Sequence, residues 1–226
     1  MNTKKQPASG ITERPILFNG AMVRAILEGR KTVTRRALPG GLDPDRLGET
    51  MSKAQWLKVN HERPVAFGIS YFCPYGQPGD RLWVRESTEA DYDTSDAVVL
   101  SRYCADKAPV MYWDEVNGEP IHAVEHWSYP RAVRPSIHML RTHSRILLEN
   151  TNVRVERLQD ITRSDIRAEG LQCPFELASD DVSPNYRDWY PAAFRDLWNS
   201  TGGDWDANPW VWVVEFKLVT PCEATT

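Results

Sequence analysis

Four cationic side chains flank two threonines in the short segment Arg30–Arg36. A threonine hydroxyl is too weak an acid to act as a nucleophile unless a base lies beside it. Lys31 could be that base only if burial or the neighbouring arginines lower its pKa towards neutrality. Spacing alone favours a simpler interpretation, in which the segment is a solvated turn and Thr34 is a strand residue with a branched side chain.

A second group of candidate residues follows the turn Gln77–Asp80. The next segment, Arg81–Glu86, alternates polar and apolar residues as a half-buried strand does. This alternation puts Trp83 and Arg85 on the same face, which is therefore a candidate pocket wall. Ion pairing of Arg85 and Glu86 at the rim of a sheet is the commoner use of such residues.

The chain has nine tryptophans, and four of them lie near its end. An aromatic face can stack on a nucleobase, and each such stack is worth about 1–3 kcal/mol. Packing in the core is the commoner use of tryptophan. Trp83 and Trp210 are the candidates to reach a ligand.

The cysteines and histidines do not form the patterns of a metal site. The four cysteines are Cys73, Cys104, Cys173 and Cys222. They are far apart and lack a C-x-x-C pair, which predicts reduced thiols rather than a disulfide framework or a zinc cluster. The pair His122 and His126 lies in an irregular stretch without partner cysteines. No metal and no cofactor is expected.

The overall composition is that of an ordinary globular chain. Its 226 residues are 41% hydrophobic and 26% charged, so one domain with generous loops is expected. The net charge of −4 argues against a protein that coats nucleic acid nonspecifically. Neither a membrane-spanning run nor the apolar centre of a signal peptide is found, which predicts a cytoplasmic protein with no membrane partner.

Periodicity predicts the elements that would position these residues. The expected strands are 15–18, 81–86, 145–149, 153–157 and 210–218, and the expected helices are 20–30, 160–170 and 190–198. Residues 30–36 are expected as a turn that leads into an extended segment. Residues 145–149 and 153–157 are predicted as two strands joined through Asn150-Thr151-Asn152. We expect a flexible tail over 1–13, a single domain over 14–219 with a loop-rich insertion at about 87–135, and a second tail over 220–226. A hairpin around Asn117-Gly118 is expected within the insertion.

The order of the motifs GRKTVTRR, PGDRLWVRE, ERLQDI, AEGL and WVVEFK resembles that of ASCH domains, which belong to the PUA-like superfamily. It is also similar to the longer ASCH-like proteins that tailed bacteriophages and prophages encode. The resemblance covers most of residues 14–219. It implies an α+β fold, with a partly open β-barrel and flanking helices.

The same resemblance implies a function. PUA domains bind RNA, and one small bacterial branch of ASCH domains is an amidohydrolase that removes the acetyl group from N4-acetylcytidine. The catalytic lysine, threonine and glutamate of that branch fall here on Lys31, Thr34 and Glu169. Thr34 would then be the nucleophile, Lys31 its base and Glu169 the group that carries a proton to the leaving amine. The basic segment supplies the expected substrate-binding residues Arg30 and Arg36, of which Arg36 would steady developing negative charge.

Three functions stay open at this point. The first is recognition of a nucleobase, free or in nucleic acid, with hydrolysis of an acyl group on its exocyclic amine; RNA is favoured over DNA. The second is a non-enzymatic, phage-encoded reader of a modified base. The third is a structural accessory protein of a virion, which an extended apolar surface in the insertion would favour. Lys31 discriminates between the first two functions: a Lys31 that is buried within hydrogen-bond reach of Thr34 and faces a cavity with Glu169 favours the enzyme, whereas a Lys31 that points into solvent favours the binding module.

Overall fold

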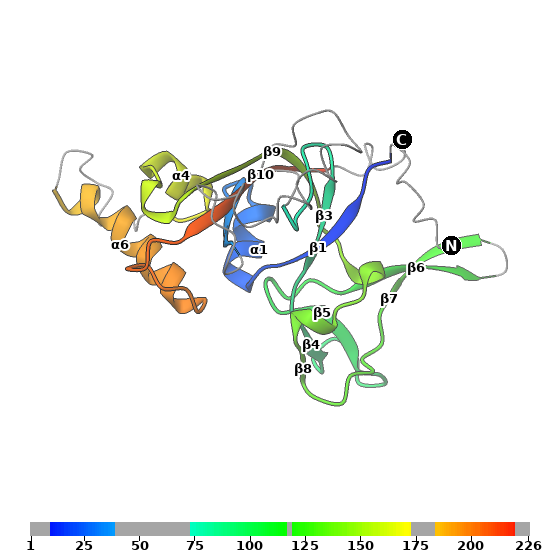
Figure 1. Cartoon of the computed structure of the whole chain (residues 1–226). Coiled ribbons are helices and arrows are strands. Elements are labelled where there is room, and N and C mark those ends of the chain that lie inside the picture. The colour runs from blue at the N-terminus through cyan, green and yellow to red at the C-terminus, as the bar shows by residue number, and fades with distance from the viewer. Residues whose placement is uncertain (1–9, 39–72, 117–118, 173–183, 220–226) are drawn as a thin grey trace.

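The computed structural model describes residues 10–38, 73–116, 119–172 and 184–219 (Figure 1). Short helices accompany three separate sheets, so the fold class is α+β. The strands are β1 (Glu13–Leu17), β2 (Val33–Ala37), β3 (Arg81–Arg85), β4 (Thr88–Asp91), β5 (Leu100–Tyr103), β6 (Met111–Val116), β7 (Glu119–Val124), β8 (Val133–Arg134), β9 (Leu147–Arg157) and β10 (Trp210–Leu218). The helices are α1 (Gly20–Leu27), α4 (Arg163–Ala168) and α6 (Pro184–Ser200), with 3-10 turns η3 (Ser136–His138), η4 (Arg141–His143) and η5 (Leu158–Asp160).

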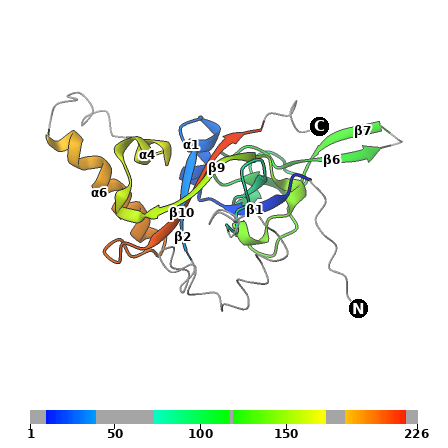
Figure 2. The same cartoon turned by 45° about the horizontal axis from the view of Figure 1, so that its top comes forward.

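The largest sheet has five strands in the order β1-β3-β9-β10-β2. β1 pairs in parallel with β3, and the other pairs are antiparallel. Alternation along β10 divides the core into two layers: Trp212 and Val214 pack on α1, whereas Val211 and Val213 pack on α4 and α6. The sheet therefore lies between α1 and the pair α4 and α6 (Figure 2).

None of the three sheets formed by the described strands closes on itself, so the expected partly open β-barrel is not confirmed. Within the described part of the chain, β1 and β2 are the two edges of the large sheet, and each pairs with one neighbour. The α+β class expected from the sequence is present, but the sheets are open.

Residues 147–157 form one long strand, so the prediction of two strands joined by a turn was wrong. Asn152 pairs with Glu215 and Asn150 with Phe216, so Thr151 is the extra residue of a bulge. Asn150 is buried and its side-chain amide donates to the Tyr75 carbonyl over 2.8 Å. These contacts with the 75–80 turn hold the polar segment inside the sheet.

Residues 88–134, within the predicted insertion, form the two smaller sheets. One has the order β5-β4-β8, and the other is the β6–β7 hairpin. Antiparallel pairing of Met111–Val116 with Glu119–Val124 confirms the hairpin expected around residues 117–118. The stretch is therefore β-structured, although its sequence lacks sustained periodicity.

Local sequence explains where the first two helices begin. The Asn19 side chain accepts from the Met22 N–H at the start of α1. At α4 the side chain of Thr162 and that of Asp165 each accept from the other residue's backbone N–H, which completes a capping box with aspartate in place of the usual glutamate or glutamine. Among the described helices, none is long and apolar enough to cross a membrane.

Cys73 and Cys104 are free thiols, while the other two cysteines lie outside the described residues. Burial, aided by Glu89, raises the pKa of Cys104 to about 11. Because the thiolate is the reactive form, we expect iodoacetamide to label Cys104 about tenfold more slowly than an ordinary thiol at neutral pH. The labelling rate of Cys104 should rise with pH until the pH passes about 11. Timed labelling followed by peptide mass spectrometry measures this rate. Fast labelling near neutral pH would contradict this environment.

Candidate active site

Lys31 lies at the centre of the candidate site, immediately before β2. It forms an isolated antiparallel bridge with Glu169, which follows α4, so two segments distant in sequence meet here. Gly170 permits this approach: its φ is +93°, and a Cβ there would lie 2.8 Å from the Ala25 Cβ and 3.0 Å from the Lys31 Cβ. The glycine of the AEGL motif thus brings Glu169 against Lys31.

The Lys31 ammonium is buried and fully hydrogen-bonded. Its Nζ donates to Glu169 Oε2 over 2.6 Å, to the Val33 carbonyl over 2.8 Å and to the Glu169 carbonyl over 3.1 Å. Burial lowers the pKa of Lys31 from its ordinary value, and the Glu169 carboxylate opposes that shift. The three acceptors match the three N–H groups of a charged ammonium.

Arg35 extends this ion pair into a buried network. Its guanidinium contacts Glu169 Oε1 at 3.3 Å and Glu156 Oε1 at 2.6 Å, and it is 3.4 Å from Asp165 Oδ2. The Arg35 side chain is only 1% exposed. Both oxygens of Glu169 are therefore held by cations, which fixes the orientation of this carboxylate.

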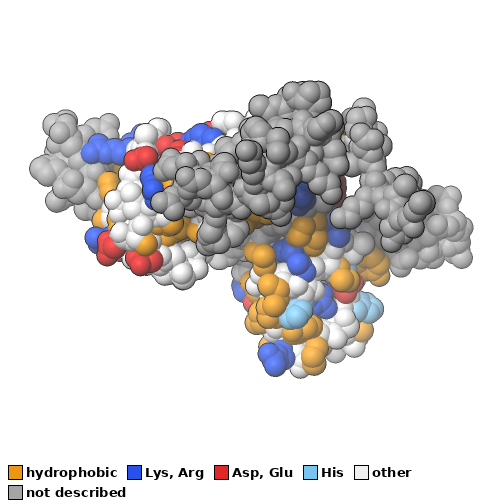
Figure 3. Space-filling model, viewed as in Figure 1, with side chains coloured by type: hydrophobic (Ala, Val, Ile, Leu, Met, Phe, Trp, Pro, Cys, Tyr) orange, Lys and Arg blue, Asp and Glu red, His pale blue; other side chains and the backbone are white. Residues whose placement is uncertain are grey.

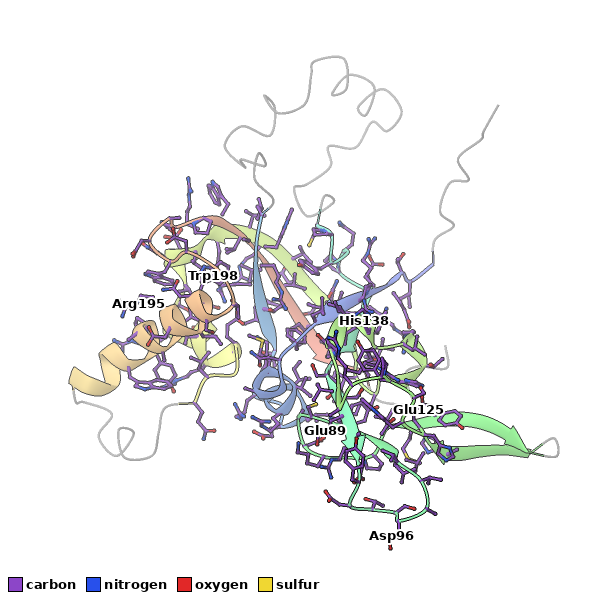
Figure 4. All side chains as sticks on the ribbon, turned by 90° about the horizontal axis from the view of Figure 1, so that it is seen from below. Glu89, Asp96, Glu125, His138, Arg195 and Trp198 are labelled. Atoms are coloured by element: carbon purple, nitrogen blue, oxygen red, sulfur yellow. The ribbon has the colours of Figure 1, made fainter. Side chains whose placement is uncertain are left out.

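A cavity of about 190 Å³ lies beside this network, between β2 and the end of α6. Its lining includes Thr34, Arg35, Arg36 and Glu169 on one side and Phe194, Leu197 and Trp198 on the other. A second hollow, of about 130 Å³, shares Met22, Glu169 and Leu197 with it. Trp198 lies on the side of α6 that faces the sheet, while Arg195 points outwards (Figure 4).

Two residues that line the cavity, Arg36 and Trp198, each have a buried side-chain donor that lacks a protein partner. Arg36 donates from Nη2 to the Leu17 carbonyl over 2.6 Å, but its Nε is buried without a hydrogen bond. Trp198 Nε1 is also buried and unpartnered, and Gly203 packs so closely that a Cβ there would lie 2.2 Å from it. Buried donors of this kind are costly unless a ligand or water satisfies them.

The structure brings Lys31, Thr34, Arg36 and Glu169 together, but in an order that the sequence did not indicate. Thr34 and Glu169 line the cavity, whereas Lys31 lies behind Glu169 and is absent from the lining. No hydrogen bond joins Lys31 to Thr34 among the described residues, because the Nζ donors are already used. Lys31 is 2% exposed and Glu169 is 4% exposed. Lys31 is therefore not part of a solvated turn, and Glu169 is not a carboxylate on a helix surface.

Arg30 lies at the edge of this group. Its guanidinium pairs with Glu28 at 2.5 Å and donates to the Gly170 carbonyl over 2.5 Å. It does not line the cavity. Its contacts support the turn that carries Glu169.

The other predicted substrate-binding residues lie elsewhere. Trp83 lies between Arg85 and Arg141, whose guanidinium carbons are 5.2 and 5.9 Å from its ring centroid. Glu86 is buried and forms two hydrogen bonds of 2.9 Å with Arg145. Trp210 packs under the Arg157 guanidinium at 4.3 Å. None of these predicted residues lines the cavity beside Thr34.

The comparisons with known proteins give one similarity. No family model matches the chain, and no curated protein matches it. The chain is similar to the solved ASCH domain from Lactobacillus crispatus JV V101, with a TM-score of 0.33 and 9% identity over 92% of this chain and 79% of that chain. A likeness at this level carries no weight for function.

Several site residues were missed by sequence reasoning. Arg35 was seen only as a neighbouring cation, yet it is the hub of the buried network. Alternation in an extended Arg30–Arg36 was the available signal, because it separates Arg35 from Thr34 and Arg36. Phe194 and Trp198 belong to the helix expected over 190–198, but a helix pattern does not indicate that they lie across the cavity from β2. In the described part of the chain, no cluster of three or more His, Cys, Asp or Glu residues could hold a metal.

Proposed function

We propose that the chain is a nucleobase-binding protein of the ASCH type and that the cavity beside Thr34 holds the base. The observation that carries this proposal is that Thr34 and Glu169 line one cavity while Lys31 is paired with Glu169 behind it, because these are the residues to which the sequence resemblance assigns a nucleoside site. The PUA-like family, RNA as the natural source of the base and the phage or prophage origin belong to the same proposal.

The chemistry of the lining suits such a ligand. Apolar walls from Phe194 and Leu197 face polar groups from Thr34, Arg36 and Glu169. Small-molecule sites combine largely apolar walls with a few converging polar groups in this way. The volume of about 190 Å³ lies below the range of about 300–1,000 Å³ common for drug-sized ligands, which favours a single base or a small acyl group.

Replacing Arg36 tests the binding proposal. We expect Arg36→Gln to weaken binding of cytidine or N4-acetylcytidine about tenfold, because one charge-assisted hydrogen bond to the ligand is lost. Isothermal titration calorimetry on the wild type and on Arg36→Gln measures this change in affinity. Arg195→Gln is the matched control, because Arg195 is exposed on the outer side of α6. Absence of nucleoside binding by the folded wild-type protein would contradict the proposal.

Hydrolysis of an acyl amide on the exocyclic amine is a second candidate function, favoured by the Glu169 carboxylate that Lys31 and Arg35 hold at the cavity wall. In this scheme Thr34 Oγ attacks the acyl carbon and gives its proton to Glu169. The C–N bond then breaks, and the amine takes that proton as it leaves. Water cleaves the resulting ester, which releases the acid and restores Thr34.

Lys31 has a different part in this scheme from the one that the resemblance implies. With all its N–H groups bonded, its first role is to orient Glu169 and balance its charge. It could accept a proton only after passing its own to Glu169, a transfer that burial of the pair makes easier. Arg36 lines the cavity, and in this scheme its guanidinium would stabilise the oxyanion.

Incubation of the protein with N4-acetylcytidine, followed by chromatography, separates the two functions. Release of cytidine supports the hydrolase. Binding without release supports a non-enzymatic reader of a modified base.

A further inference from the structure

A stretch without acidic residues includes β8, an edge strand of the β5-β4-β8 sheet. Between Glu125 and Glu149 the chain has no aspartate or glutamate, yet it has four arginines. The whole chain has a net charge of −4, so this segment departs from the average. It includes β8, η3 and η4, far from the cavity beside Trp198, as the position of His138 in Figure 4 shows.

Three arginines at this surface have no carboxylate partner among the described residues. Arg131 is exposed and forms no ion pair. Arg134 is 8% exposed, and its Nη2 donates to the Ser128 hydroxyl over 3.4 Å. Arg85 donates to the carbonyls of Ile137 and Met139, and its Nε is buried without a partner. Cations left without carboxylates attract an external anion.

Aromatic rings alternate with these cations. The Arg134 guanidinium lies 5.3 Å from the Trp127 ring centroid and 5.5 Å from that of Tyr129. Tyr129 is in turn 6.0 Å from the His138 ring. The Arg85 guanidinium lies 5.2 Å from the Trp83 ring centroid and donates to the Met139 carbonyl. Figure 3 shows hydrophobic, cationic and histidine side chains together over this part of the molecule, with few acidic ones.

The middle of this surface is open to solvent. Ile137 is 57% exposed and Leu140 58%, and His138 between them is also exposed. We call the face formed by Trp83, Arg85, Trp127, Tyr129, Arg131, Arg134, Ile137, His138 and Leu140 the 127–140 surface.

We propose that the 127–140 surface binds a single-stranded nucleic acid, with its arginines on phosphates and its rings and exposed apolar side chains on unpaired bases. This proposal goes beyond the nucleoside cavity, because it needs none of the cavity residues. Aromatic rings interleaved with cations are what sequence-tolerant binding of single strands requires. A duplex is a poorer fit, because its bases are stacked and their faces cannot contact the rings. An anionic membrane is also a poorer fit, because cations alone would bind it and the interleaved rings would have no role.

Fluorescence anisotropy with labelled oligonucleotides of about 12 nucleotides tests the proposal on the full chain. We expect single-stranded RNA or DNA to bind more tightly than a duplex of the same sequence. At low salt, Arg131→Gln should weaken strand binding about tenfold, and the slope of log K against log salt should fall by about 0.7. Comparison of the RNA and DNA strands identifies the natural sugar. His138→Ala should weaken binding about fivefold by removing a ring.

Arg195→Gln is again the matched control and should bind strands like the wild type, because Arg195 lies on the outer side of α6. Thermal unfolding of each variant shows that the fold is kept. Nucleoside binding by Arg131→Gln is measured in parallel, so a failure of the cavity proposal is distinguishable from a failure of this one. Equal strand binding by Arg131→Gln and wild type would overturn the proposal, as would binding to vesicles of anionic phospholipid with no binding to single strands.

Discussion

Replacing Lys31 by methionine is expected to lower the free energy of unfolding by about 3–5 kcal/mol. The substitution leaves Glu169, which is 4% exposed, with Arg35 at 3.3 Å as its remaining ion-pair partner. Removing one member of a buried ion pair costs this much because the other charge stays desolvated and uncompensated. Urea unfolding of the wild type and of Lys31→Met measures this difference, provided that the free energy of unfolding falls with urea concentration at the same slope in both proteins.

Two further variants separate the ion pair from ordinary packing. The double variant Lys31→Met with Glu169→Leu should recover much of the loss, because exchange of a whole buried pair for apolar residues is often nearly neutral. Lys217→Met is the matched control, since its salt bridge with Glu149 is 52% and 30% exposed and worth at most about 1 kcal/mol. Equal small losses for Lys31→Met and Lys217→Met would show that the buried pair does not form.

Elements with a strong local pattern could be predicted from the sequence. The strand β10 has the bounds expected for 210–218, because its run of Val and Trp is buried on both faces of the sheet. The β3 strand was also predicted to within one residue, since a turn precedes it and its residues alternate. In both cases the periodicity and the burial agree.

Elements that depend on distant contacts could not be predicted. The Asn150-Thr151-Asn152 stretch has the composition of a turn, but contacts with the 75–80 turn hold it in a bulge. The site has the same limitation. Lys31 and Glu169 are separated by 138 positions, and only the sheet order together with Gly170 brings them into contact. The motifs predicted that Lys31 and Glu169 belong to one site. Only the fold shows that Glu169 lines the cavity and that Lys31 lies behind it.

That order bears directly on the nucleophile. If Lys31 orients Glu169 and Glu169 receives the proton, a hydroxyl of the cavity lining must attack the acyl group. The lining has two hydroxyl residues, Thr34 and Thr201, and Thr201 Oγ1 already donates to the Trp198 carbonyl over 2.8 Å, which favours Thr34. We expect Thr34→Val to reduce the rate of cytidine release from N4-acetylcytidine by about 10³-fold or more, because valine keeps the branched shape and removes the oxygen. The fold should be kept, and nucleoside binding should change little.

Thr32→Val is the matched control, because Thr32 is an exposed threonine two residues away that does not line this cavity. It should release cytidine at the wild-type rate. Mass spectrometry of quenched reactions adds a direct measurement: with Thr34 as nucleophile, the wild-type peptide that contains it should gain one acetyl group, and the Thr34→Val peptide should not. Undiminished turnover by Thr34→Val would mean that water attacks directly with Glu169 as its base, and the cavity would then be a hydrolytic site without a covalent intermediate.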